Sequence, residues 1–248
     1  MKQLYVVGIG PGDKEDMTLR AFRALEESDV IAGYGVYNDI VRPMFPDKEY
    51  IETPMRQERE RCRLAIDAAL SGKTTAMISS GDAGVYGMAS LILEMTEGMR
   101  DLQVQIIPGV TAALSGAALL GSPLGHDFAV ISLSDALTPW ADIEKRLRFA
   151  AQAGLCLSIY NPASHKRPDY LKRACDILLE ILPPETACGV AVNIGRENEM
   201  KRVMALSDLR EYPADMFTTV FVGNASTRVI DGSLVTPRGY RLEGQRHE

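Results

Sequence analysis

Residues 78–87 read Ile78-Ser79-Ser80-Gly81-Asp82-Ala83-Gly84-Val85-Tyr86-Gly87 and follow a short apolar run that starts at Thr75. Such a run is typical of a buried strand in a parallel sheet. A helical pattern begins at Val85, so the segment is expected to be a loop at the carboxyl end of a strand, where open α/β sheets bind ligands. Its small residues let a ligand approach the backbone. Asp82 carries the loop's charge, and it either contacts a ligand or caps the following helix.

The composition predicts a globular protein with a substantial core, because 46% of the 248 residues are hydrophobic and 24% are charged. The formal net charge of −6 disfavours nucleic acid as a partner, since phosphates need a basic face. No apolar run reaches the ~18 residues that span a membrane, and the N-terminal residues lack the apolar region of a signal peptide. The four cysteines have no CxxC or metal-ligand spacing. We therefore expect a cytoplasmic protein with reduced thiols and no metal centre.

A second glycine-rich loop, Gly8-Ile9-Gly10-Pro11-Gly12-Asp13, follows the predicted strand 4–7. The dinucleotide fingerprint GxGxxG would require glycine at position 13, where Asp13 stands. Pro11 also removes a backbone N–H of the kind that cradles a phosphate. The loop therefore favours a neutral or cationic ligand over pyrophosphate, and a nicotinamide oxidoreductase stays open as an alternative.

Further loops of this kind follow other predicted strands. Pro108-Gly109-Val110-Thr111-Ala112 comes after a strand at 104–107, and Thr111 is placed as the N-cap of a helix that reaches about Leu120. A glycine-bearing loop at 33–37 follows a strand at 30–32. The mixed charges at 56–63 predict a solvated helix face, and the alternative is that one or two of these arginines hold substrate carboxylates.

The break at 121–125 predicts a domain boundary, with α/β lobes at residues 1–122 and 123–248. The first lobe alternates strands and helices, as a parallel sheet with crossover helices does. The second lobe is expected to form a mixed sheet, with strands at 128–133, 155–160, 189–192, 201–205 and 218–222. A cleft between the lobes is the expected ligand site.

Three of these segments, 8–12, 80–82 and 107–112, together resemble motifs of the tetrapyrrole methylase family. The resemblance implies two αβα lobes with the active site in the cleft between them, and S-adenosylmethionine as the methyl donor. The likeness is closer to one branch of the family, through 79–88, 126–128, 133–140, 160–162, 222–224 and 236–240. This branch methylates carbon 17 of a precorrin-3 type tetrapyrrole, metal-free or cobalt-bound, and contracts its ring in cobalamin biosynthesis. A methylase that acts at another ring carbon, or on diphthine, is the alternative.

The resemblance also implies residues that contact the cofactor and the substrate. The implied cofactor residues are Gly10, Pro11, Gly81, Asp82, Val85, Thr111 and Ala112 in the first lobe, and Tyr160, Asn161, Asn193 and Asn224 in the second. The substrate bears many carboxylates, for which we select basic residues near strand-end loops: Lys166, Arg167, Arg196 and Arg238. The family implies a homodimer.

Ring contraction moves protons, which is the work of a His, Tyr or carboxylate side chain. His126 and Asp127 lie near the predicted boundary, and Tyr160 ends a predicted strand. The hypothesis is that at least one of these three residues acts in contraction rather than in methyl transfer. The alternative is that His126 only hydrogen-bonds the linker. Methyl transfer itself needs alignment of the donor with an electron-rich carbon, and no nucleophilic side chain.

Overall fold

The computed structural model describes residues 2–12, 14–164 and 166–240. The chain divides into two compact units, residues 1–112 and 113–248. The division falls one helix earlier than the boundary expected after Ser122. Each unit is described separately below.

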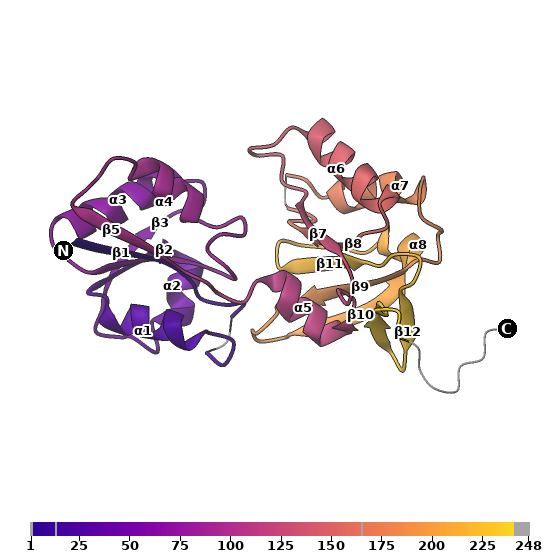
Figure 1. The fold of residues 1–248 in the computed structure, drawn as a ribbon, viewed down its shortest axis with the longest axis horizontal. Coiled ribbons are helices and arrows are strands. Elements are labelled where there is room, and N and C mark those ends of the chain that lie inside the picture. Colours follow the sequence, from indigo (N-terminus) through magenta and orange to yellow (C-terminus); the bar gives the residue numbers. More distant parts are fainter. Residues whose placement is uncertain (1, 13, 165, 241–248) are drawn as a thin grey trace. The chain divides into compact units, whose positions relative to one another are not determined.

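The first unit contains a five-stranded parallel sheet in the order β3-β2-β4-β1-β5. Its strands are β1 (Lys2–Gly8), β2 (Val30–Tyr34), β3 (Glu49–Thr53), β4 (Thr75–Ser79) and β5 (Leu102–Ile107). The crossover helices are α1 (Leu19–Glu27), α2 (Gly35–Val41), α3 (Glu58–Leu70) and α4 (Ala89–Met95). Helices α1 and α2 cover one face of the sheet, and α3 and α4 cover the other (Figure 1). The predicted parallel α/β arrangement is therefore confirmed.

Apolar residues on both faces explain why these strands read as continuous hydrophobic runs. Val6 and Met77 belong to the core under α3 and α4, whereas Val7 and Ile78 belong to the core under α1 and α2. Two local expectations are wrong. The loop predicted at 33–37 instead completes β2 and starts α2, and the helix expected from Val85 begins at Ala89.

The second unit contains a mixed five-stranded sheet in the order β10-β9-β11-β8-β7, as expected. Its strands are β7 (Phe128–Ser132), β8 (Cys156–Tyr160), β9 (Ala187–Val192), β10 (Met200–Ala205) and β11 (Thr218–Val222). Strands β7 and β8 are parallel, and the other pairs are antiparallel. A smaller sheet is formed by β6 (Gly121–Ser122), β12 (Arg228–Ile230) and β13 (Ser233–Val235).

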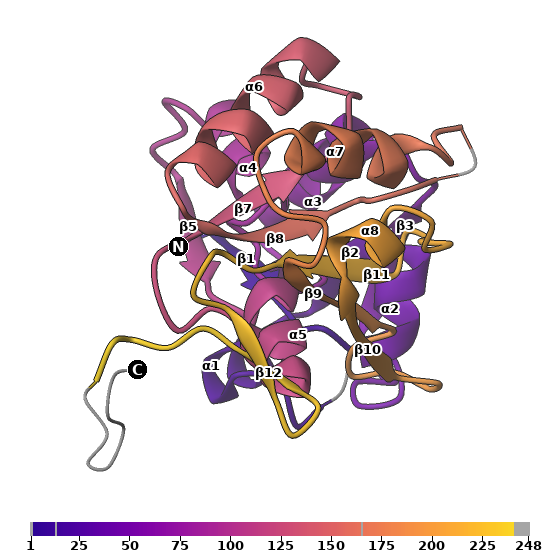
Figure 2. The ribbon, with the colours of Figure 1, turned by 90° about the vertical axis from the view of Figure 1, so that its right-hand side faces the viewer.

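Helices cover both faces of the larger sheet of the second unit. They are α5 (Ala112–Leu120), α6 (Trp140–Gln152), α7 (Tyr170–Leu179) and the short α8 (Leu206–Leu209). Helices α6 and α7 lie on one face, and α5 lies on the other (Figure 2). Helix α5 begins directly after Thr111, as predicted.

The packing of α5 explains the position of the boundary. A Cβ atom added to Gly116 would lie 2.9 Å from the ring of Phe221, and one added to Gly189 would lie 2.7 Å from the side chain of Leu120. Strand β6, which follows α5, pairs with β13. The small residues of α5 thus fit it closely against the second sheet, and the helix belongs with that sheet rather than with the first.

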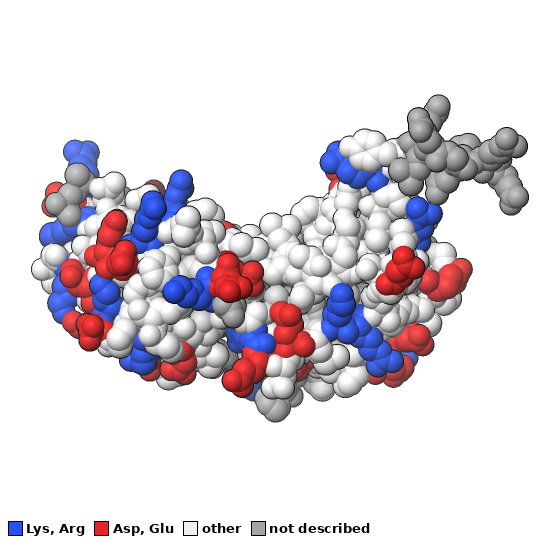
Figure 3. Space-filling view, turned by 90° about the horizontal axis from the view of Figure 1, so that it is seen from below, with Lys and Arg blue, Asp and Glu red and all other residues white. Residues whose placement is uncertain are grey.

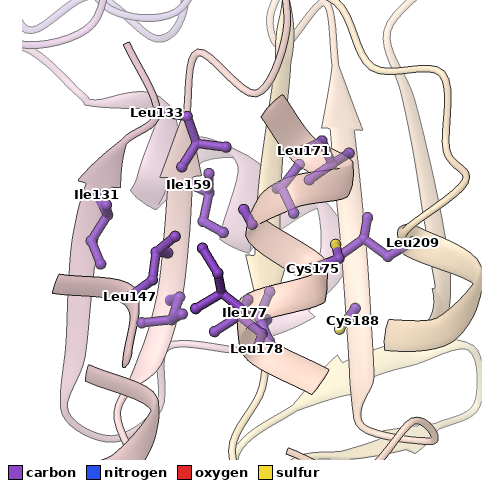
Figure 4. Packing of buried hydrophobic residues seen from close by; sticks show 14 of the residues in the cluster. Ile131, Leu133, Leu147, Ile159, Leu171, Cys175, Ile177, Leu178, Cys188 and Leu209 are labelled. Carbon is purple, nitrogen blue, oxygen red and sulfur yellow. The ribbon is translucent and has the colours of Figure 1, made fainter. Parts of the chain in front are cut away.

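The larger core of the second unit contains two of the four cysteines (Figure 4). Leu178 of α7 and Ile159 of β8 are among its buried members. Cys175 and Cys188 are buried within it, and all four cysteines are free thiols.

We expect the native protein to react very slowly with Ellman's reagent at pH 8, because the thiolate is the reactive form and burial disfavours it. Burial raises the pKa of Cys62 to about 11 and that of Cys175 to about 12. It also raises the pKa of Cys188. These thiols stay protonated as the pH rises through 8 and ionise only near the raised values. Titration before and after denaturation in guanidinium measures the difference, and rapid modification of these thiols in the native protein would contradict it.

Charged side chains of both signs are interspersed on the face of each unit shown in Figure 3. Some ion pairs lie within one helix, as those of Arg63 with Glu60 and Asp67 on α3 do. In the part of the chain that the structure describes, no helix is both long and apolar enough to cross a bilayer.

Candidate active site

The loops after β1 and β4 are joined through their backbones. Gly81 N donates to Gly10 O at 2.7 Å, and Gly10 N donates to Gly81 O at 3.1 Å. Ile9 N also donates to Ser79 O at 3.0 Å. Because β1 lies between β4 and β5 in the sheet, the loops after all three strands meet at its carboxyl edge.

Asp82 connects this pair to the third loop, which follows β5. Its Oδ1 accepts a hydrogen bond from Gly84 N at 2.8 Å, and its Oδ2 accepts one from Gly109 N at 2.9 Å. Asp82 does not cap α4, whose N-cap position is Met88. The capping alternative is therefore wrong for the helix, and the carboxylate instead joins two loops.

Glycine is required where the three loops touch. A Cβ atom on Gly109 would lie 2.5 Å from Gly8 O and still closer to Gly81 O. One on Gly8 would lie 2.6 Å from Gly81 O. Both obstacles are backbone atoms at strand ends, which cannot move aside. We call residues 8–12, 79–87 and 108–112 the glycine cluster.

Hydrogen bonds within the glycine cluster use several backbone N–H groups that a phosphate would need. The N–H groups of Ile9, Gly10, Gly81 and Gly109 are all bonded within the cluster, and Pro11 has none. A pyrophosphate would need several such groups. S-adenosylmethionine carries a sulfonium cation and no phosphate, so it does not need these N–H groups. Asp13, the acidic residue that favoured a cationic ligand in the sequence, lies outside the described residues.

The other first-unit cofactor candidates lie around this contact. Gly81 has φ +69°, a conformation that glycine adopts without strain. The Cβ position of Gly81 would be 3.5 Å from Thr111 Cα, so the second and third loops are in van der Waals contact there. Val85, Thr111 and Ala112 are each half-buried. The loops thus bring together the first-unit residues that the sequence selected.

In the second unit, the carboxyl ends of β8 and β9 lie on the same side of the sheet and carry Tyr160, Asn161 and Asn193. Strands β8 and β9 both pair antiparallel to β11, so they run in the same direction and end at this edge. Asn161 and Asn193 follow these strands with φ of 53° and 52°. The Tyr160 hydroxyl accepts a hydrogen bond from Ala113 N at 2.6 Å. Lys166, Arg167 and Arg196 follow the same two strands.

Asn224 lies at the opposite edge, because it follows the reversed strand β11. Its Nδ2 donates to Gly154 O at 2.9 Å, and its Oδ1 accepts from Ser226 N at 3.0 Å. These bonds hold a turn. Asn224 therefore lies at the other end of the strands from Asn161 and Asn193, and its contact with the cofactor stays a prediction.

His126 and Asp127 also lie away from Tyr160. They precede β7, whose first residue pairs with Cys156 and whose last pairs with Tyr160. One strand of five residues, about 16 Å long, separates them from the Tyr160 edge. Both side chains are exposed, and Asp127 N donates to His126 Nδ1 at 2.9 Å. The structure gives no reason to group these three residues in one proton-transfer site.

The basic candidates differ in what they contact. Arg167 forms an ion pair with Asp135 at 2.6 Å, so its charge is already neutralised. The Arg196 guanidinium lies 5.5 Å from the ring centre of Phe217, and Lys166 is exposed. Exposed Arg238 follows Thr236, whose Oγ1 donates to Pro123 O at 2.6 Å. Thr236 also contacts Cys156 at the start of β8, so Arg238 follows a residue at the edge opposite Tyr160.

Sequence reasoning missed Arg173, and it included Arg61 only within a segment whose arginines were an alternative for binding substrate carboxylates. Arg173 lies with its guanidinium 4.0 Å from the ring centre of Trp140 and 5.0 Å from that of Tyr170. Arg61 lies in the segment expected to be solvated, yet it is 4% exposed. Helical spacing gave a signal, because Arg61 shares a face with Ala65, four residues later, which is fully buried.

Comparison with known proteins defines the class. Residues 3–210 match the Tetrapyrrole (Corrin/Porphyrin) Methylases, and the chain belongs to this family. The resemblance seen in the sequence is confirmed, and with it the identification as an S-adenosylmethionine-dependent methyltransferase. The nicotinamide oxidoreductase that the first loop left open is excluded.

Particular relatives are similar over nearly the whole chain. A protein of Salmonella typhimurium named probable cobalt-factor III C(17)-methyltransferase is 46% identical, over 96% of this chain and 100% of its own length. The precorrin-3B C(17)-methyltransferase of a Sinorhizobium species is 39% identical over 96% of both chains. The crystal structure of the methyltransferase CobJ superposes with a TM-score of 0.89 at 37% identity, covering 96% of this chain and 100% of that one.

Proposed function

We propose that this protein transfers a methyl group from S-adenosylmethionine to carbon 17 of a precorrin-3 type tetrapyrrole, with ring contraction, in cobalamin biosynthesis. The observation that carries the proposal is the 46% identity to the Salmonella relative along that protein's full length. The glycine cluster supports this proposal. Several of its backbone N–H groups are already hydrogen-bonded, and a sulfonium ligand does not need them. Relatives named for both substrates match, so the metal-free and the cobalt-bound macrocycle are both candidates.

The cofactor, when bound, supplies a methyl group on a positively charged sulfur. The residues of the chain hold the methyl donor and orient it toward the acceptor carbon. Asp82 fixes the third loop against the first two, and Gly10, Pro11, Gly81, Val85, Thr111 and Ala112 form the surface for the donor. The acceptor is an electron-rich carbon of the substrate, so well-oriented contact can supply most of the rate without a nucleophilic side chain.

Tyr160, Asn161 and Asn193 remain our second-unit candidates. The Tyr160 oxygen accepts a hydrogen bond from Ala113 N, and a phenol can both accept and donate a proton. We assign Tyr160 as the candidate for proton transfer during contraction. Tyr160→Phe should then incorporate labelled methyl normally while accumulating uncontracted macrocycle. If Tyr160→Phe loses methyl transfer and ring contraction together, Tyr160 aligns the substrate and does not transfer a proton.

The testing experiment has two stages. S-adenosylhomocysteine should raise the melting temperature, because a ligand at 100 times its Kd stabilises the native state by ~2.7 kcal/mol. NAD, the control ligand, should not. Protein with labelled S-adenosylmethionine and either precorrin-3B or its cobalt form should then give a methylated product, with NMR reporting the contracted ring. A shift with NAD and none with S-adenosylhomocysteine would contradict the proposal.

We further propose that the protein works in the cytoplasm as a homodimer. Four buried free thiols are consistent with a reducing compartment. Sedimentation equilibrium measures the assembly, and a monomer mass at micromolar concentration would contradict the dimer.

A further inference from the structure

Arg61 places a guanidinium at the carboxyl edge of the first sheet. Its Nε donates to Thr53 Oγ1 at 2.9 Å, and its Nη2 donates to Pro54 O at 3.1 Å and Thr53 O at 3.4 Å. Thr53 is the last residue of β3. The Cζ of Arg61 also lies 5.9 Å from the ring centre of Tyr34, the last residue of β2. The guanidinium is therefore fixed by strand ends and does not swing on a flexible stem.

The charge of Arg61 has no acidic partner in the described part of the chain. All its hydrogen bonds go to neutral oxygens, whereas Arg63 on the same helix is paired with Glu60 and Asp67. The Nη1 atom of Arg61 makes no hydrogen bond to any described residue. It is also not one of the fully buried polar atoms, so part of it is exposed to solvent. A cation out of water costs free energy unless an anion compensates it. Nη1 is thus a donor open to an incoming anion.

The surroundings of Arg61 suit a flat apolar ligand. Tyr34 is half-buried at the end of β2, and Val36 and Met55, which follow β2 and β3, are 38% and 47% exposed. Parallel strands lie about 4.8 Å apart, so the end of β3 is roughly 10 Å from the end of β4, where the glycine cluster begins. A ligand broad enough to lie beside a cofactor on that cluster would reach Arg61.

We propose that Arg61 Nη1 binds a peripheral carboxylate of the tetrapyrrole, with Tyr34, Val36 and Met55 against the macrocycle. This inference rests on the proposed function and adds to it a substrate subsite. Arg61 suits this role better than Arg167, since Asp135 already occupies the Arg167 guanidinium. The rigid anchoring by Thr53 and Pro54 lowers the entropy lost on binding.

The test uses the full-length protein and uroporphyrin III, a macrocycle with eight carboxylates, titrated by its fluorescence. Arg61→Gln should weaken uroporphyrin binding by about 10-fold or more, because a charge-assisted hydrogen bond is lost. The matched control is Arg63→Gln, two residues along α3, which should bind like wild type. The octamethyl ester of uroporphyrin should not distinguish the variants. S-adenosylhomocysteine affinity should be unchanged in both.

Thr53→Val serves as a second variant, since Arg61→Gln removes buried hydrogen bonds and can destabilise the unit. It deletes the Oγ1 acceptor of Arg61 Nε and should weaken uroporphyrin binding several-fold with the charge retained. A folded Arg61→Gln or Thr53→Val protein that binds uroporphyrin as wild type does would overturn the inference. So would wild-type protein that binds S-adenosylhomocysteine but no uroporphyrin. Failure to bind S-adenosylhomocysteine would instead contradict the proposed function.

Discussion

Gly109→Ala is expected to lower the melting temperature by roughly 5–10 °C and to reduce methyl transfer by about 100-fold. The new Cβ would lie 2.5 Å from Gly8 O and closer still to Gly81 O. Gly8 ends β1, and Gly81 is held by its two backbone hydrogen bonds with Gly10. The third loop must therefore move away from the first two, and it carries Thr111 and Ala112 with it. Differential scanning calorimetry and labelled methyl transfer measure the two effects.

Gly35→Ala is the matched control, because it changes a glycine at the same edge of the same sheet. Its Cβ would meet nothing nearer than Glu52 Oε2 at 3.8 Å, and Gly35 is the first residue of α2. Alanine is the better helix former, so stability should be equal or slightly higher. A Gly109→Ala protein that melts and methylates like the control would show that the loops are not packed as described.

The sequence predicted the strands of the two larger sheets except β3, because buried apolar runs ended in loop-forming segments. It did not predict β3 or the strands of the small sheet. It also indicated that the loops after β1, β4 and β5 bind a ligand. It could not show why Gly8 and Gly109 must be glycine, because the atoms that exclude a side chain come from other strands. The sequence also could not show that Asp82 accepts a hydrogen bond from the loop after another strand. The donor is the N–H of Gly109, 27 residues away.

The position of Asn224 in the second unit depends on strand direction. Asn224 follows an apolar run just as Asn161 and Asn193 do, and the pattern of residues does not reveal whether that run is parallel or antiparallel to its neighbours. Because β11 runs antiparallel to both β8 and β9, its carboxyl end is at the other edge. The burial of Arg61, in contrast, could have been predicted from the sequence. Its helical spacing relative to buried Ala65 did carry the information, which the many charges of 56–63 obscured.

Asp82→Asn is expected to weaken S-adenosylhomocysteine binding by about 10-fold or more, because a charge-assisted hydrogen bond contributes ~1.5–3 kcal/mol. Asp82 uses its two carboxylate oxygens as acceptors, one for Gly84 N and one for Gly109 N. Asparagine has the same shape but offers one oxygen, so its NH₂ group must face one of these N–H donors. Asp82→Ala loses both bonds and should weaken binding further, by about 100-fold.

Isothermal titration with S-adenosylhomocysteine measures both Asp82 variants, and circular dichroism reports whether they fold. Asp67→Asn provides the control, since Asp67 is 55% exposed on α3 and, among the described residues, its ion pair is with surface Arg63. Exposed ion pairs contribute ~0–1 kcal/mol, so this variant should bind normally. If Asp82→Ala also binds normally, the bond from Gly109 does not position the third loop for the cofactor. If Asp82→Asn binds weakly and Asp82→Ala more weakly still, the carboxylate acts through both of its acceptors, because each variant removes one more of them.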